Sequence, residues 1–218
     1  NLSRAEIVSQ VRDIKNDLQD PKSLTNLVFM GMGEPLANYR NLVAAIQIIT
    51  DGRFGFGFAG RRVTVSTAGL ASRLADLGRD TRVSLAVSLN AADDDTRSRL
   101  MPINRKFPIE KLLEACRHFP LRGGRRITFE YVLLKDVNDS ADDARRLAKL
   151  LRPIKSKINL IPFNSYPGSP YQRPHEDTIF RFQKILIDKN YTVMIRRSKG
   201  QDISAACGQL AARGQIFR

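Results

Sequence analysis

Apolar residues along this chain follow two periods, which alternate from one end of the sequence to the other. Runs of β-branched and aliphatic residues such as VSLAVSL at 83–89 are typical of strands, whereas apolar residues three or four positions apart are typical of helices. Predicted strands cover 27–32, 63–66, 83–89, 126–134, 158–163 and 192–196. Predicted helices cover 3–18, 41–50, 70–77, 94–100, 109–119, 140–151 and 179–189, and a small-residue helix or loop follows the last strand.

The strict alternation of strand and helix predicts an α/β fold. Such an order is typical of a parallel sheet, either open or closed into a barrel. Two helix starts are marked by capping boxes, Ser3 with Glu6 and Ser140 with Asp143. The chain shows no internal repeat, low-complexity segment or linker, so we interpret residues 1–218 as one domain.

The bulk composition is that of a folded soluble protein, with 42% hydrophobic and 27% charged residues among 218. No apolar run approaches the roughly 18 residues that a membrane helix needs, and no signal-peptide pattern opens the chain. The two cysteines, Cys116 and Cys207, are too few and too far apart for a zinc site or a disulfide framework. We therefore expect no membrane association and a reducing, cytoplasmic location.

Positive charge is the strongest signal in the composition. Lys+Arg 36 minus Asp+Glu 22 gives a net charge of +14, with a pI near 10.3. Paired arginines such as Arg61-Arg62 and Arg125-Arg126 lie beside predicted strands rather than in a tail, which indicates a folded basic surface. A nucleic-acid partner is favoured over a basic enzyme whose charge only keeps it in solution.

Polar groups follow several predicted strands, at the edge where parallel α/β folds bind ligands. A glycine at such a turn, Gly33, lets the backbone approach a ligand, and the adjacent Glu34 can accept hydrogen bonds from an amino group. The other polar groups suit hydroxyl or carboxylate partners; they are Ser66, Ser88, Asn90 and Asn164. Together these residues predict a small-molecule site without naming the ligand.

Five sequence blocks carry a resemblance to a known family. They are MGMGEPLANY, FGFGFAGRRVTVSTAGL, AVSLNAADDDTRSRLMPINRKFPIEKLL, KINLIPFNSYPGSPY and DISAACGQLA. In this order, and over nearly the whole chain, they resemble the radical-SAM adenosine-C2 RNA methyltransferases (the RlmN/Cfr family). The Gly-Glu-Pro form and the FGFG segment are more similar to the housekeeping C2 enzymes than to the C8-methylating resistance branch.

The resemblance implies a partial (β/α) barrel of the radical-SAM type, with S-adenosylmethionine (SAM) and a [4Fe–4S] cluster as cofactors. By position, Gly33 and Glu34 match the motif that holds the SAM amino group. The other matching SAM-binding positions are Ser66, Ser88, Leu89, Asn90 and Asn164. In these terms, Glu34 ends a core strand in order to face a cationic amine.

Cys207 matches the cysteine that is itself methylated in the family. Because C2 of adenine is not nucleophilic, direct polar methyl transfer from SAM fails there. The resemblance implies that a methyl group is first placed on this sulfur. A radical from a second SAM then removes a hydrogen atom from it, and the resulting carbon radical adds to the ring. Cys116 matches no family role, and we expect it to be structural.

The family's CxxxCxxC cluster loop is absent from this sequence, which contains no metal ligand that we can assign. We expect that the first barrel strand, the cluster ligands and a second functional cysteine lie upstream in a parent protein. This chain alone is then inactive. The resemblance implies rRNA, tRNA or both as substrates, and an electron donor such as a flavodoxin-type reductant.

Three alternatives remain open from the sequence. One is a C8-methylating relative of the resistance type. Another is a barrel enzyme acting on a phosphorylated small molecule, although Tyr166-Pro167-Gly168-Ser169-Pro170 makes a poor phosphate loop. The third is a non-catalytic basic RNA-binding barrel, which leaves Cys207 and the polar strand ends unexplained.

Overall fold

The computed structural model describes residues 1–30, 33–166 and 168–196. Its strands form one six-stranded sheet in the order β1-β2-β3-β4-β5-β6, and every neighbouring pair is parallel. The strands are β1 (Leu27–Phe29), β2 (Val63–Thr67), β3 (Ser84–Ser88), β4 (Ile127–Leu133), β5 (Ser156–Pro162) and β6 (Val193–Ile195). The helices are α1 (Arg4–Asp17), α2 (Tyr39–Thr50), α3 (Leu74–Asp80), α4 (Asp94–Leu100), α5 (Ile109–Arg117), α6 (Ala141–Leu151) and α7 (Glu176–Asp188).

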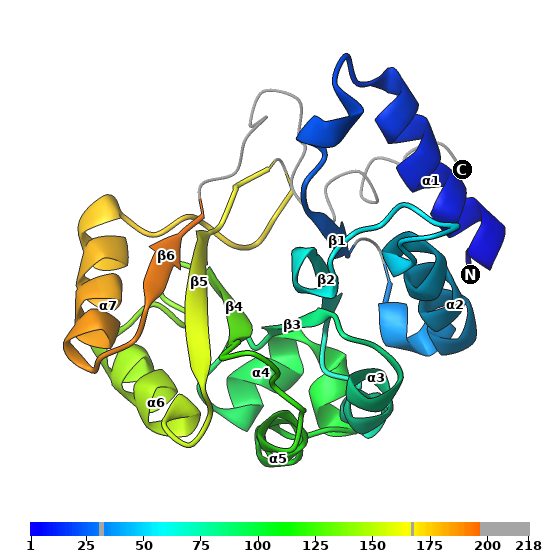
Figure 1. Cartoon of the computed structure of the whole chain (residues 1–218). Coiled ribbons are helices and arrows are strands. Elements are labelled where there is room, and N and C mark those ends of the chain that lie inside the picture. The colour runs from blue at the N-terminus through cyan, green and yellow to red at the C-terminus, as the bar shows by residue number, and fades with distance from the viewer. Residues whose placement is uncertain (31–32, 167, 197–218) are drawn as a thin grey trace.

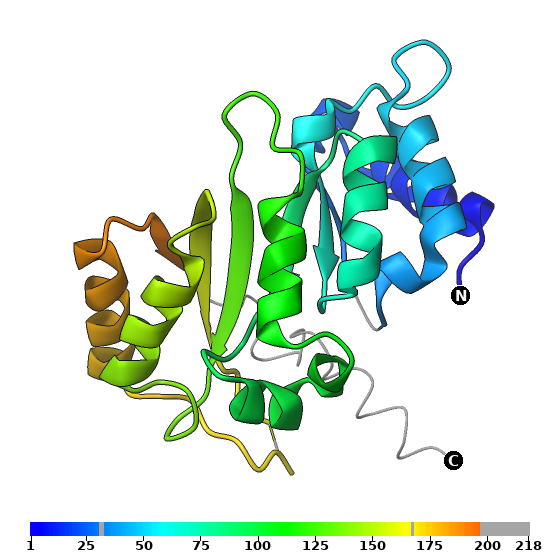
Figure 2. The same ribbon diagram turned by 90° about the horizontal axis from the view of Figure 1, so that it is seen from below.

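The sheet curves into an open arc with the helices along its outer side (Figure 1). Figure 2, turned by 90°, shows the strands lengthwise with the helices running beside them. Within the described residues β1 and β6 are the two edges of the sheet and do not pair with each other. The predicted parallel α/β architecture is confirmed, and the arc has the form of a partial barrel.

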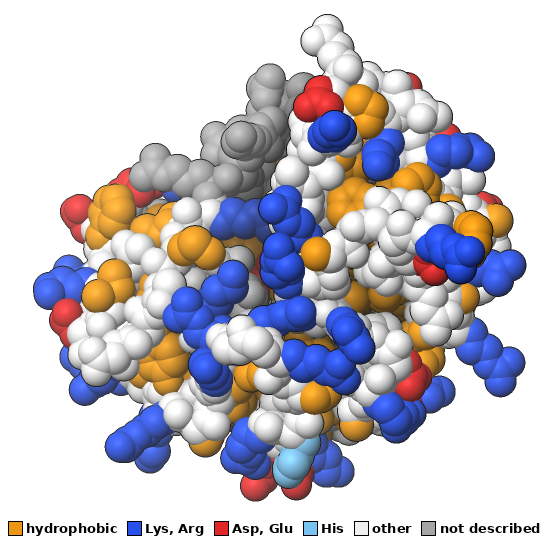
Figure 3. All heavy atoms as spheres, viewed as in Figure 1, with side chains coloured by type: hydrophobic (Ala, Val, Ile, Leu, Met, Phe, Trp, Pro, Cys, Tyr) orange, Lys and Arg blue, Asp and Glu red, His pale blue; other side chains and the backbone are white. Residues whose placement is uncertain are grey.

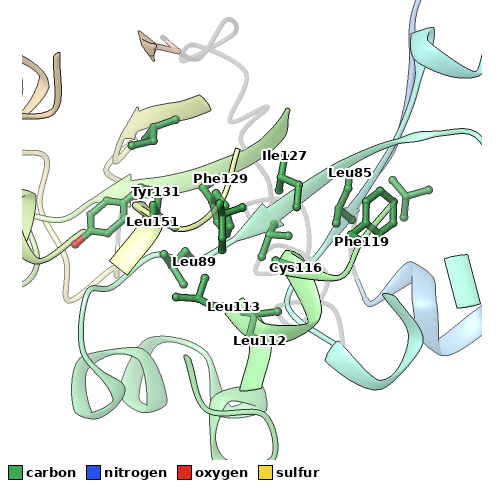
Figure 4. Packing of buried hydrophobic residues seen from close by; sticks show 14 of the residues in the cluster. Leu85, Leu89, Leu112, Leu113, Cys116, Phe119, Ile127, Phe129, Tyr131 and Leu151 are labelled. Atoms are coloured by element: carbon green, nitrogen blue, oxygen red, sulfur yellow. The ribbon is translucent and has the colours of Figure 1, made fainter. Parts of the chain in front are cut away.

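Alternate residues of each strand face the two sides of the arc. In β4, Ile127, Phe129 and Tyr131 are fully buried against the outer helices. Figure 4 shows Phe129 and Tyr131 in one packed cluster with side chains of α5. The residues between them, among them Glu130, therefore face the concave inner side, because successive strand side chains point to opposite faces. This alternation separates an apolar helix-packed core from a more polar interior.

Both predicted capping boxes are present. The Ser3 hydroxyl accepts a hydrogen bond from the Glu6 amide, and the Glu6 carboxylate accepts one from the Ser3 amide at 2.7 Å. Ser140 and Asp143 make the same reciprocal pair at the start of α6. Each pair satisfies two amides that a helix start leaves without intrahelical acceptors.

Several boundaries differ from the sequence prediction. Helix α7 begins at Glu176, three residues before the predicted start, because the polar Glu176 and Asp177 carry no apolar period although acidic residues suit a first turn. Strand β5 begins at Ser156 rather than 158, and β1 ends at Phe29 rather than 32. Apolar patterning underestimates elements whose first residues are polar, as in α7 and β5, and it overestimates β1, where the apolar Met30 continues the pattern but not the strand pairing.

Cys116 lies in the core on α5 and is 1% exposed. Burial raises the pKa of its thiol to about 12, with a smaller opposing effect from Arg97. A raised thiol pKa lowers the thiolate fraction at neutral pH, and the thiolate is the reactive form. We therefore expect iodoacetamide to leave Cys116 unmodified in the folded protein at pH 8 and to modify it in denaturant, as measured by peptide mass spectrometry. Rapid labelling of the folded protein would contradict this buried position.

Candidate functional site

The Glu34 carboxylate joins the ends of β1 and β2. Its Oε1 accepts a hydrogen bond from the Leu36 amide at 3.0 Å and caps the short 3-10 turn Pro35–Asn38. Its Oε2 accepts bonds from the Thr67 hydroxyl at 2.9 Å and the Ala68 amide at 2.7 Å. A carboxylate has about four acceptor positions, so these three bonds leave room for one further donor. Glu34 thus has a structural role that the sequence did not reveal, together with spare capacity for a cation.

Gly33, beside this carboxylate, has φ of +112°. That value lies in the left-handed region, where a side chain would be strained and glycine is favoured. No atom lies within 4 Å of the position that a Cβ would take, so backbone geometry rather than crowding explains the glycine. The predicted close approach of backbone and ligand is therefore sterically open at this residue.

A second carboxylate, Glu130, lies on the inner face and was missed in the sequence. It is 8% exposed, and its Oε2 accepts a hydrogen bond from the Ser66 hydroxyl at 3.2 Å. The Arg196 guanidinium lies 3.8 Å from Oε1. A single charged residue inside the apolar strand 127–133 was the available signal, because a buried carboxylate needs partners or a ligand.

Strand register places three polar residues side by side on the inner face. Ser88 of β3 is opposite Glu130 of β4, and Glu130 is opposite Asn159 of β5. The Asn159 Oδ1 is buried and has no hydrogen-bond partner among the described residues. A buried amide oxygen without a donor is costly, so this oxygen is suited to a ligand donor or a water.

Leu89 and Asn90 have side chains that are committed to the fold, so they contribute their backbone to the site. Leu89 is fully buried in the core, and its amide donates to the Glu130 carbonyl at 2.9 Å. Asn90 has φ of +58°, and its Oδ1 accepts from the Val132 amide at 2.9 Å. Asn164 is half-buried two residues after β5 ends. Cys207 lies outside the described residues.

Arg97 of α4 holds the carboxyl ends of β2 and β3 together. It is fully buried, and its guanidinium donates to the carbonyls of Ala68 at 2.8 Å, Ser88 at 3.1 Å and Leu89 at 3.0 Å. It also donates to Asn104 Oδ1 at 2.8 Å. Burial lowers the pKa of Arg97 to about 10, with Asp94 opposing the shift, so the group remains charged at neutral pH.

Gly69 follows the first of these carbonyls and has φ of +115°. A Cβ at this position would lie 2.9 Å from Arg97 Nη2 and 3.1 Å from Leu112 Cδ2. The glycine therefore lets the guanidinium reach the strand end, and it fixes the turn after β2.

A cavity of about 620 Å³ lies between α1 and β1 and extends to Gly33 and Glu34. Its walls are mainly apolar, including Ile7, Val11 and Val28. The carboxylate of the candidate site is thus reached from an apolar groove along the β1 edge of the sheet.

The inner face fits SAM as far as the described residues allow. Glu34 has an unused acceptor position, and Asn159 offers a buried oxygen without a partner. Among those same residues no group of three His, Cys, Asp or Glu side chains could hold a metal ion. This part of the chain therefore does not fit the cluster. No helix in the described ranges is long and apolar enough to cross a membrane.

A parallel partial barrel with polar groups at the carboxyl ends of its strands is the class of α/β fold that places its ligand sites at those ends. The profile of the radical SAM superfamily matches residues 2–150. The chain therefore belongs to the radical SAM superfamily, whose cofactors are SAM and a [4Fe–4S] cluster.

Two curated relatives illustrate the similarity. The dual-specificity RNA methyltransferase RlmN of Desulfosudis oleivorans is 58% identical over 212 residues, which are 97% of this chain and 57% of that protein. The protein of the same name from Geobacter sulfurreducens is 55% identical over 213 residues, which are 98% of this chain and 58% of that protein. The chain thus spans less than two thirds of the length of these relatives.

Solved structures agree with the fold. A radical SAM methyltransferase from Sphaerobacter thermophilus matches with a TM-score of 0.88 and 45% identity, over 96% of this chain and 62% of that one. A domain of pyruvate-formate lyase-activating enzyme from Bacteroides vulgatus matches at 0.60 and 20% identity, over 78% and 98% of the two chains. The second likeness concerns the fold alone.

Proposed function

We propose that the complete protein is a radical-SAM methyltransferase that methylates C2 of an adenosine in large-subunit rRNA, and in tRNA next to the anticodon. The observation that carries this proposal is the 58% identity to a protein named dual-specificity RNA methyltransferase over 97% of the chain. The net charge of +14 supports an RNA substrate. The proposal includes a cytoplasmic location and a flavodoxin-type electron donor.

In this proposal the residues of the described chain bind and orient SAM, which together with the cluster supplies a methyl group and a carbon radical. Glu34 accepts a hydrogen bond from the SAM amino group beside Gly33 while its other bonds keep it in place. Ser66, Ser88 and Asn164 hydrogen-bond the remaining polar groups. Leu89 and Asn90 shape the pocket through their backbone, because their side chains are committed elsewhere.

Cys207 is proposed to carry the methyl group that is transferred. The methyl thioether brings a C–H bond to the adenine ring, whose C2 does not attack an electrophile. The residue lies in Ala206-Cys207-Gly208, outside the described residues, so this role rests on the sequence resemblance.

We also propose that a segment upstream of Asn1 in the complete protein adds the first barrel strand and the cluster ligands. Support comes from the relatives, which are longer than this chain, and from β1. On the inner face Val28 is 51% exposed, and β1 pairs only with β2 among the described residues. A strand at that edge would pair with the free backbone N–H and C=O groups of β1 and would cover the apolar groove.

The test of the proposed function is a reaction of the complete protein with SAM, a reductant and unmodified rRNA or tRNA. The digested nucleosides are analysed by mass spectrometry against standards. We expect 2-methyladenosine. A product that matches 8-methyladenosine would move the enzyme to the C8-methylating branch, and the absence of any methylated adenosine with a loaded cluster would contradict the proposal.

Glu34→Gln is expected to weaken SAM binding to the complete protein about 10- to 100-fold, measured by isothermal titration. The estimate follows from losing a charged hydrogen bond worth about 1.5–3 kcal/mol. Thr67→Val is the matched control, since it removes a bond to the same carboxylate but keeps the charge. Its effect on SAM affinity should be smaller. Equal losses in both variants would show that Glu34 acts only through the fold.

A further inference from the structure

Arginine and lysine side chains line the edge of the sheet that is opposite the candidate site. The strand-start basic band consists of Arg61, Arg62, Arg82, Arg125, Arg126 and Lys155, each within two residues of the start of its strand. The corresponding segments 59–63, 81–84, 122–127 and 154–157 contain no Asp or Glu. In Figure 3, which has the same view as Figure 1, Lys and Arg side chains gather across the middle of the face shown.

Contacts between neighbouring strand starts make the band continuous. The Ser84 hydroxyl donates to the Arg61 carbonyl at 3.2 Å, which joins the starts of β2 and β3. The Arg125 guanidinium donates to the Arg82 carbonyl at 2.6 Å, and the Ile127 amide donates to the Lys155 carbonyl at 3.0 Å. The cations of four successive strands therefore form one surface.

The band has no neutralising partners. Within the described ranges none of its six side chains takes part in an ion pair. Cations on the outer helices differ, because Arg145 pairs with Asp142 and Lys184 pairs with Asp188. Four of the band residues, Arg82, Arg125, Arg126 and Lys155, precede strands without ending a helix. Arg61 and Arg62 end only the three-residue 3-10 turn Gly60–Arg62, which is too short for its dipole to explain them. Adjacent unpaired cations repel one another, which makes this surface suited to an external polyanion.

We propose that the strand-start basic band binds the phosphate backbone of the substrate RNA outside the reaction site. This inference rests on the proposed function. Strands of five to seven residues separate the two edges by about 15–25 Å at roughly 3.3 Å per residue. The bound RNA extends over that distance, about five to seven nucleotides at ~3.4 Å each along a helix axis. Such phosphate contacts supply affinity and register, not sequence recognition.

The test uses the complete protein and the triple variant Arg61→Gln, Arg82→Gln, Lys155→Gln. None of these three side chains makes a hydrogen bond or ion pair within the described residues, so the fold should be retained. Binding of an unmodified tRNA transcript is measured against salt concentration. Losing three phosphate contacts should reduce the slope of log K against log salt by about 2 and lower the affinity about 100-fold near ~0.1 M salt.

The matched control is Arg12→Gln, Arg145→Gln, Lys184→Gln, which removes the same charge from cations that are paired with carboxylates. Its slope should remain close to that of the wild type. If both variants lost the same RNA affinity, net charge alone would explain the effect, and the proposal would be overturned. Unchanged RNA binding in the band variant would also overturn the proposal. If an acidic electron-donor protein then reduced this variant more slowly than the wild type, the band would bind that protein rather than RNA.

Two further measurements separate this proposal from the proposed function. An oligonucleotide of about four nucleotides around the target adenosine is too short to reach the band at ~3.4 Å per nucleotide, so the band variant should methylate it at the wild-type rate. A slower rate with this oligonucleotide would contradict the assigned position. If the wild-type protein methylates no RNA, the proposed function fails, while the salt slopes still decide whether the band binds RNA.

Discussion

Replacing Cys207 by alanine in the complete protein is expected to abolish methylation of RNA, lowering the rate by roughly 10⁴-fold or more, as the loss of a covalent nucleophile does. Without the sulfur no thioether forms, and the methyl group has no route to a carbon that does not act as a nucleophile. RNA binding should stay within a few-fold of the wild type, since a small side chain replaces another. The measurement is methyl transfer from labelled SAM to rRNA, with binding followed in parallel.

Cys116→Ala is the control, because this thiol is buried in the apolar core on α5. It should keep its methylation activity at a modest loss of stability. Peptide mass spectrometry of the wild type gives an independent reading: the Cys207 peptide should be heavier by one methylene and the Cys116 peptide unmodified. Methylation by the alanine variant at position 207, or an unmodified Cys207 in cluster-loaded protein exposed to SAM, would refute the methyl relay.

Arg97→Met is expected to destabilise the protein by about 3–5 kcal/mol, because a buried acceptor that loses its donor costs about 1–3 kcal/mol and several lose it here. The substitution leaves three backbone carbonyls and the Asn104 oxygen without their donors inside the core. For a domain of this size 1 kcal/mol shifts Tm by about 2–4 °C, so a fall of roughly 10 °C is expected. Thermal unfolding followed by circular dichroism provides the measurement.

Arg99→Met is the matched control, since Arg99 lies on the same helix, is exposed and, among the described residues, donates only one hydrogen bond, to the Thr96 hydroxyl at 3.4 Å. Its change in stability should lie within about 0.5 kcal/mol. Because Arg97 binds the carbonyls at the ends of β2 and β3, the methionine variant should also bind SAM more weakly. A variant with wild-type Tm would show that the network contributes little to the fold.

The sequence predicted the features that depend on neighbouring residues. The capping boxes at Ser3 and Ser140 are local patterns, and both are present. The alternation of periods was enough to predict a parallel α/β sheet, because each βα unit carries its own apolar signature. The predicted start of α7 was too late, because its first residues are polar and carry no apolar period. The predicted end of β1 was also too late, because the glycine-rich turn after it has no period that marks where the strand stops.

The site was harder to predict because its contacts join residues far apart in the chain. Strand register places Ser66 level with Ala86 and Thr128, and Glu130, two residues further along the same face of β4, accepts the Ser66 hydrogen bond. Arg97, in a run of charged residues, resembles a solvated helix position and is fully buried instead. For Glu34 the sequence indicated an acceptor, but not the bonds to Thr67 and Ala68 that hold it.

The order of the sheet also bears on how the chain folds. Within the described residues every strand pairs with the strand that precedes or follows it in the sequence, so no contact between these strands must wait for a distant part of the chain. The entropic cost of closing the loops between paired strands therefore stays moderate. Each new βα unit can pair with the edge strand formed by the unit before it. We expect the domain to assemble progressively during synthesis, from the β1 side toward β6. The reaction site, which draws on strands from both ends, is then completed last.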